Sequence, residues 1–354
     1  MFCGMAFLLF FVYNKLGGVT HAHEQLTNLM NDPTVKEQTA KLSAGGFRGW
    51  TNMPSFNTPI WWSVVSSIIM GVGIGVLAQP QLVVRFMTVK SNRELNRAVA
   101  SGGVFILFAT GVAFTVGALS NVLFFKDNGK ISLLVAEGKV DDIIPLFLKN
   151  YLPDWFGTIF LLVLLAAAMS TLSSLYHTIG TSLGRDFFEK GLGIKKGTVL
   201  LTRLGIMIAI IISAVLAYVG NELKVLELGL IAQATSVFFG LCAAAFLPSY
   251  IAALYSKRPS RRAAISIIVT GSVVSFIWIF FIHAKNSNLI GLCKLLFKKN
   301  YLFEGAGAFF EKLSLVDSVL IALPISIIVL VAVTLLSKQD VEAAHLDKCF
   351  NGVK

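Results

Sequence analysis

Small and hydroxyl side chains recur along the apolar segment 154–184 in a pattern that could hold a cation. They follow one another at steps of three or four residues, which places them on one face of a helix. Hydroxyl and backbone carbonyl oxygens suit a hard cation, and a neutral cage of them releases a monovalent ion readily. The same side chains could equally be packing residues whose hydroxyls bond back to their own helix. They are Ala167, Ser170, Thr171, Ser174, Thr178 and Thr181.

A glycine-rich stretch in segment 59–87 is the second candidate for chemistry. Gly71, Gly73 and Gly75 alternate with apolar residues and weaken a helix, and Pro80 removes one of its hydrogen bonds. Helices interrupted in this way expose their backbone to ligands inside membrane proteins. However, Gly71 and Gly75 also form a G-x-x-x-G pair, which is typical of close helix packing. The sequence leaves both interpretations open.

A lone amide, Gln233, lies in the apolar segment 226–254 and is followed by Thr235 and Ser236. An amide that faces the interior of a helix bundle can bind a polar solute, or it can bond to a neighbouring helix. The sequence favours the second role, although Gln233 remains a candidate for solute contact.

The elements that must position these residues are long apolar segments. The chain has 354 residues, of which 55% are hydrophobic and only 14% charged, with a mean hydropathy of +0.75. Soluble domains carry about a quarter charged residues, whereas about 20 apolar residues suffice to cross a bilayer. The composition therefore predicts a polytopic membrane protein that lies in a lipid bilayer. Its predicted spans are 59–87, 98–125, 154–184, 198–219, 226–254, 263–284 and 315–337.

The net charge of +11 comes from Lys and Arg in short stretches between the spans. No compact basic domain forms, so we expect no nucleic-acid partner. Basic loops at 85–97, 185–203 and 255–262 predict the cytoplasmic side, and the lysine-rich stretch 285–313 is an exception that falls outside. Both termini are then cytoplasmic. No nucleotide-binding or hydrolase motif appears, so we expect neither an enzyme nor an organic cofactor.

The N-terminal region differs from the spans. Its apolar run ends at Tyr13 and is short for a membrane crossing, and no basic residue precedes it as in a signal peptide. Residues 1–18 are therefore predicted to be the end of a truncated transmembrane helix, in preference to a signal peptide or an interfacial segment. Residues 19–57 are polar and are predicted to form an external loop.

Two of these motifs resemble segments of the sodium:solute symporter family, which includes proline, pantothenate, sugar and monocarboxylate permeases. Gly75-x-x-x-Gln79-Pro80, with the following Arg85-Phe86-Met87, resembles the family's GQPH and RFM residues. Residues 166–171, AAAMST, resemble its AA-x-MST segment, and the order and separation of the two motifs agree. The match covers roughly residues 1–255.

The resemblance implies an inverted-repeat transporter fold of five plus five helices, all-α and polytopic. Residues 59–254 would form the five core transmembrane helices of the second repeat. Residues 255–354 would add two peripheral transmembrane helices, a loop and a short cytoplasmic tail. The expected location is the cytoplasmic (inner) membrane.

The resemblance also implies a sodium site at the backbone carbonyl of Ala167 and the hydroxyls of Ser170 and Thr171. The rest of that site comes from a broken helix in the first repeat, so the missing N-terminal helices are needed to complete it. Three explanations are open: a truncated gene model, a protein split between two chains, or a remnant. The sequence favours truncation.

The implied function is sodium-coupled symport of a small organic solute, with sodium as the coupling ion. Val72 and Val76 stand where proline permeases have a Trp and a Tyr, and Gln81 replaces the family's His, which argues against proline. A small organic acid or an amino acid is slightly favoured. The alternatives are a membrane sensor of transporter origin or an inactive transporter remnant. The candidate solute-binding residues are Gly71, Val72, Gly75, Val76, Gln79 and Gln233.

Overall fold

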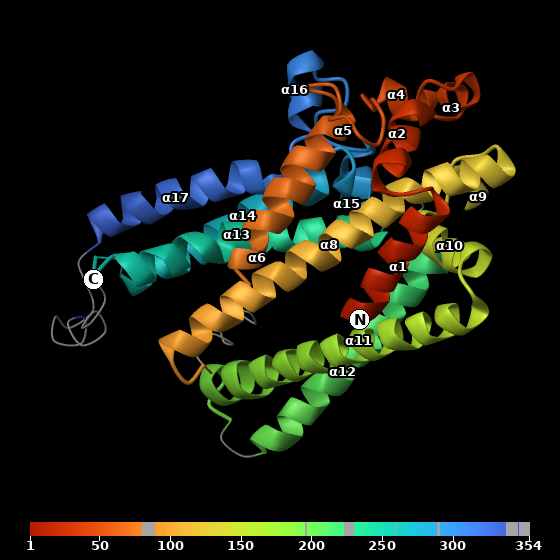
Figure 1. Cartoon of the computed structure of the whole chain (residues 1–354). Helices are drawn as coiled ribbons and strands as arrows, with labels where there is room; N and C mark the ends of the chain where they lie inside the picture. The colour runs from red at the N-terminus through yellow and green to blue at the C-terminus, as the bar shows by residue number, and fades with distance from the viewer. Residues whose placement is uncertain are drawn as a thin grey trace. The chain divides into compact units, whose positions relative to one another are not determined.

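The structure is a computed structural model of the chain that describes residues 1–79, 89–194, 197–222, 230–258, 260–288, 291–337 and 346. Within these ranges every regular element is a helix and no strand occurs (Figure 1). The helices form two compact units. Unit 1 consists of Met1–Thr39 and Ser91–Gly229, and unit 2 consists of Ala40–Lys90 and Leu230–Lys354.

Seven described helices are long and apolar enough to cross a membrane, and each falls on one of the seven predicted segments. Their mean hydropathy lies between 2.0 and 3.0. The predicted all-α, polytopic fold class is thereby confirmed, while the inverted repeat and the domain boundaries stay predictions. The seven helices are Pro59–Leu77, Asn92–Asn128, Asp154–Gly191, Val199–Tyr218, Ala234–Tyr255, Arg261–Ile282 and Ser318–Leu336.

The N-terminal region is more helical than the sequence suggested. The segment predicted as an external loop, 19–57, contains helices, and a 72° bend separates its first helix from the one before. Gly17 and Gly18 make this bend with φ of +85° and +107°, a region that favours glycine. The four helices are α1 (Phe2–Lys15), α2 (Val19–Leu29), α3 (Pro33–Gln38) and α4 (Ala40–Ala44).

Unit 1 is organised around the 37-residue helix α8 (Asn92–Asn128). The Ser91 side chain caps its first turn by accepting a hydrogen bond from the Glu94 amide, and Gly129 ends it in the left-handed conformation. Only the second half of α8 is buried within the fold, where α1 and α2 pack on it. The other elements of unit 1 are α9 (Ser132–Val135), η2 (Val140–Asp142), α10 (Ile143–Tyr151), α11 (Asp154–Thr181), η3 (Ser182–Gly191) and α12 (Thr198–Glu222).

Unit 2 is built on α13 (Leu230–Tyr255), α14 (Arg261–Ile277) and α17 (Ser318–Leu336), which run side by side in Figure 1. Ser260 hydrogen bonds to Ser337 at one end, and the Trp278 indole donates to the Val316 carbonyl at the other, so α14 and α17 are antiparallel. The remaining elements are α5 (Pro59–Trp62), η1 (Ser63–Val72), α6 (Gly73–Leu77), η4 (Trp278–Ile282), η5 (Asn286–Asn288), α15 (Leu292–Phe297) and α16 (Ala308–Leu313).

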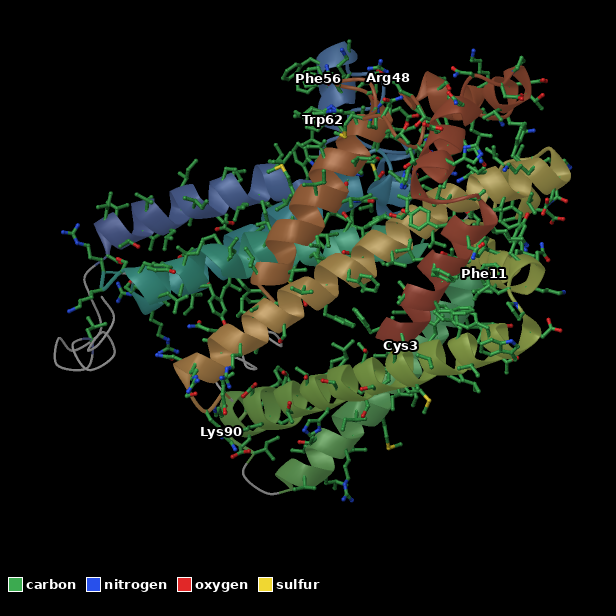
Figure 2. All side chains as sticks on the ribbon, viewed as in Figure 1. Cys3, Phe11, Arg48, Phe56, Trp62 and Lys90 are labelled. Carbon is green, nitrogen blue, oxygen red and sulfur yellow. The ribbon has the colours of Figure 1, made fainter. Side chains whose placement is uncertain are left out.

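Aromatic side chains gather where the first predicted span begins. Figure 2 shows Phe56 and Trp62 close to the start of this helix. The rings of Phe56 and Trp61 lie 4.9 Å apart and those of Trp61 and Trp62 4.8 Å apart, and the Trp62 indole donates to Asn57. Aromatic rings with a polar group are typical of the membrane–water interface, so this cluster indicates where the span leaves the bilayer.

Candidate functional site

The polar face predicted from the sequence lies along α11 in unit 1. The side of α11 and η3 that lies opposite the polar face packs closely on α12. Gly180 shows this, because a Cβ added there would lie only 2.8 Å from the Thr202 carbonyl oxygen. The Tyr176 hydroxyl bonds to Ser213 on α12 at 2.7 Å. Tyr176 and Gly180 lie half a turn away from Ala167 and Thr171 on the helix wheel. The polar face is therefore turned away from α12.

The oxygens of this face are accessible in the structure. Ser170 and Thr171 are exposed and Ala167 is half-exposed. The Thr171 hydroxyl donates to the Ala167 carbonyl oxygen at 3.0 Å, which brings two of the three predicted sodium ligands together. One turn of helix therefore presents a carbonyl and a hydroxyl oxygen side by side, a pair of ligands that a hard cation can share.

The same bond also fits the packing interpretation. Thr178 donates to the Ser174 carbonyl at 2.9 Å, so back-bonding by hydroxyls repeats along the helix. Thr181 donates likewise to the carbonyl of His177 at 3.0 Å. Such bonds satisfy a hydroxyl in an apolar environment without any ligand. The geometry is compatible with both roles, and the sodium site stays a prediction.

The glycine-rich stretch lies in unit 2, and its helix continues through the glycines to Leu77. Gly71 and Gly75 are both buried against α13. A Cβ on Gly75 would lie 2.5 Å from the Phe239 Cβ and 2.6 Å from its carbonyl carbon. The close-packing interpretation therefore holds for Gly75, because only a glycine lets the two backbones approach so closely. Packing against α13 therefore stabilises the glycine-rich stretch, whose glycines weaken it as a helix.

The other candidate solute residues surround this contact. Val72 and Val76 are half-exposed, and Gln79 is buried, with 5% of its surface exposed. Gln233 lies in α13, the helix that packs on η1 and α6, but its side chain lies outside the described residues, as do Pro80 and Gln81. Gly71 and Gly75 thus pack on the helix that carries Gln233. All of these residues belong to unit 2, whereas the α11 face belongs to unit 1.

A buried polar cluster in unit 2 was missed from the sequence. Asp317, which directly precedes α17, is 1% exposed and accepts a hydrogen bond from Ser236 on α13. Its amide donates to the Ser66 hydroxyl on η1. The one sequence signal was an acidic residue at the edge of the last apolar segment. Its partners lie far away in the sequence, so no local pattern could assemble the cluster.

Comparison with known proteins agrees with the motifs. The model of the family described as Sodium:solute symporter family matches residues 1–271. Sodium/proline symporter 2 of Staphylococcus saprophyticus is 29% identical over 257 residues, which cover 70% of this chain and 47% of that protein. The sodium/proline symporter of Staphylococcus aureus is also 29% identical, over 258 residues with the same coverage. The chain thus spans about half the length of these relatives. No solved structure matches it.

Proposed function

Because this chain belongs to the sodium:solute symporter family, whose members are transporters and not enzymes, we propose that it serves in sodium-coupled symport of a small organic solute. The observation that carries the proposal is the exposed polar face of α11, where Thr171 and the Ala167 carbonyl meet in a helix of a multi-pass membrane protein. Sodium would bind to the Ala167 carbonyl oxygen and to the hydroxyls of Ser170 and Thr171. Further oxygen ligands would be needed to complete the coordination shell.

The solute would bind near the glycine-rich stretch and α13. Gly71 and Gly75 bring the two backbones together, Val72 and Val76 lie on the same helix, and Gln79 follows two residues after its end at Leu77. The half-exposed valines make this stretch apolar, and residues 71–77 contain no aromatic ring for stacking on a sugar. We therefore favour a small organic acid or an amino acid. The relatives named as sodium/proline symporters are consistent with the amino-acid option.

Coupling would follow from linkage between the two sites. If sodium tightens solute binding by a given factor, solute must tighten sodium binding by the same factor. Helices of the two repeats would then rock against each other and expose both sites to the inside. The predicted core, residues 59–254, supplies helices to both units of the structure.

We expect the chain to lie in the cytoplasmic membrane with both termini inside. Basic residues support this orientation, because they lie in alternate connections along the chain, after the first, third and fifth apolar helices. Lys90, Arg93 and Arg97 precede the apolar part of α8, Arg185 follows α11, and Arg261 begins α14. Excess Lys and Arg mark cytoplasmic loops in multi-pass proteins.

Substitution of the two hydroxyl ligands tests the sodium site. Ser170→Ala and Thr171→Ala should each raise the sodium concentration for half-maximal uptake by the transporter by about tenfold, since each removes an oxygen ligand. The readout is uptake of radiolabelled amino acids and organic acids into membrane vesicles under an imposed sodium gradient. Thr158→Ala is the matched control, because Thr158 back-bonds in the same way, to the Asp154 carbonyl, but lies on the opposite side of α11 from Ala167. An unchanged sodium dependence in both ligand variants would refute the site.

A further inference from the structure

Asp317 is a carboxylate buried among membrane helices at the start of α17. Its Oδ2 accepts from the Ser236 hydroxyl at 3.0 Å, and its Oδ1 accepts from the Val319 amide at 3.2 Å and the Ser318 hydroxyl at 3.4 Å. Its own amide donates to the Ser66 hydroxyl at 3.2 Å. Three separate elements, η1, α13 and α17, thus bring oxygen atoms to one point inside unit 2.

The Asp317 carboxylate has one hydrogen-bond acceptor position that these donors do not use. An ionised carboxylate offers about four acceptor positions, and the three donors above use three of them. Among the described residues Asp317 forms no ion pair with a lysine or an arginine. A buried charge is costly unless it is paired or fully hydrogen bonded, and an ionisable residue among membrane helices usually marks a functional site.

The nearest titratable neighbour does not supply the missing positive charge. His283 is buried at the end of the α14–η4 helix, and its Nδ1 accepts a hydrogen bond from the Asn286 amide at 3.1 Å. Burial lowers the pKa of His283, and attraction to Asp317 opposes this only in part. Burial therefore holds the imidazole toward its neutral form, and the positive charge of Lys285 acts on the same ring in the same direction.

Two glycines leave room beside Asp317. At Gly71 on η1, the three nearest atoms to an added Cβ would all be oxygens: the Ser66 carbonyl at 3.3 Å, the Ser236 hydroxyl at 3.7 Å and Asp317 Oδ1 at 3.8 Å. At Gly240 on α13, an added Cβ would lie 3.1 Å from both Asp317 Oδ1 and the Ser318 hydroxyl. The nearest neighbours of a methyl group added at Gly71 would thus all be oxygen atoms, and an inward shift of about 1 Å would place an ion roughly 2.3–2.8 Å from them.

We propose that Asp317, with Ser66, Ser236 and Ser318, forms a second cation site that takes a sodium ion in unit 2. The site would lie in the space beside Gly71, with the Asp317 carboxylate as its charged ligand. The proposed site belongs to unit 2, whereas the α11 face belongs to unit 1. Because Ser66 belongs to the helix with the glycine-rich stretch, an ion here would tie that helix to α13 and α17.

Asp317 also caps α17 through the Val319 amide, and a cap alone is the competing explanation. Asp317→Asn separates the two, because asparagine caps a helix as well as aspartate but brings no charge. Asp32→Asn is the matched control, since Asp32 caps α3 through the Thr34 and Val35 amides at a half-exposed position. Both variants should unfold at the temperature of the parent if capping is all that these carboxylates do.

The test is equilibrium binding of radioactive sodium to the purified chain in detergent, without solute. It is done in a Ser170→Ala, Thr171→Ala background, so that failure of the α11 site cannot be mistaken for failure of this one. We expect saturable binding that Asp317→Asn weakens by about tenfold or more, while Asp32→Asn leaves it unchanged. No saturable binding in the background chain, or equal binding with Asp317→Asn, would overturn the proposal.

A second variant covers the case in which Asp317→Asn fails to fold. Gly71→Ala places a methyl group in the proposed space, and its three nearest oxygens, at 3.3–3.8 Å, leave room for the methyl group with little shift. We expect this chain to unfold at a similar temperature and to lose sodium binding. Retained binding in a folded Gly71→Ala chain would show that the ion does not sit there, and the proposal would fall.

Discussion

Replacement of Gly75 by alanine tests whether this residue is needed for packing or for solute. The added Cβ would overlap backbone atoms of Phe239 on α13, with 2.6 Å to the carbonyl carbon and a shorter approach to the carbonyl oxygen. A backbone cannot rotate out of the way as a side chain can. Overpacking of this kind costs about 1–3 kcal/mol. Alanine in a helix gains about 0.5–1 kcal/mol over glycine, which offsets part of that loss.

Gly73→Ala is the matched control for Gly75→Ala. Gly73 lies two residues away in the same helix, and no atom of the described residues lies within 4 Å of its added Cβ. It should therefore show only the helix gain of about 0.5–1 kcal/mol. The difference in stability between the two variants isolates the overpacking at α13, and we expect it to be about 1–3 kcal/mol.

Thermal unfolding in detergent, followed by a thiol-reactive dye, measures this difference. Cys242 on α13 and Cys293 are buried and become reactive when unit 2 opens. The exposed Cys3, together with Cys349, is replaced by serine beforehand. Equal unfolding temperatures for the two glycine variants would refute the packing argument. Unchanged stability with a loss of solute uptake only in the Gly75 variant would assign that residue to the solute.

Two further predictions concern the ends of the helices. The Gln38 side chain donates to the Gly129 carbonyl at 2.8 Å and accepts from the Ile131 amide at 2.9 Å. Gln38→Ala should therefore speed hydrogen exchange of the Ile131 amide, because about 1 kcal/mol of protection is lost. Gln38→Glu keeps the acceptor oxygen and should retain that protection. Burial lowers the pKa of His283, so the unfolded chain takes up a proton at a higher pH than the folded one. Stability should therefore be full above the unfolded pKa of about 6.5 and fall as the pH drops toward the folded value. Thermal unfolding between pH 8 and 5 checks this, and a slope that survives in His283→Gln would contradict it.

The sequence alone determined the features that depend on neighbouring residues. The seven spans follow from runs of apolar residues, and all seven appear as helices of sufficient length. The polar face of α11 follows from steps of three and four, and the bond from Thr171 to Ala167 is the contact that this spacing produces. The family motifs are equally local, since each lies within one segment.

The tertiary structure decided what the glycines do. Gly71, Gly73 and Gly75 look alike in the sequence, yet a Cβ added at Gly75 would overlap Phe239, one added at Gly73 would have no described atom within 4 Å, and one added at Gly71 would have oxygen atoms as its nearest neighbours. Helical periodicity can place residues on a face, but it cannot say which helix covers that face. The role of each glycine depends on the helix that packs on it. For Gly75 this is the helix that carries Phe239, which lies far away in the sequence.

Asp317 shows the same limit for polar residues. As a sequence feature it is one acidic residue before an apolar segment, which predicts no more than a helix cap. Its amide meets the hydroxyl of Ser66 across 251 positions of the chain, and its carboxylate meets Ser236 across 81. Spans and helix faces are properties of local sequence because backbone hydrogen bonds repeat every turn. A buried cluster exists only when distant helices pack together, so only the tertiary structure could assemble this one.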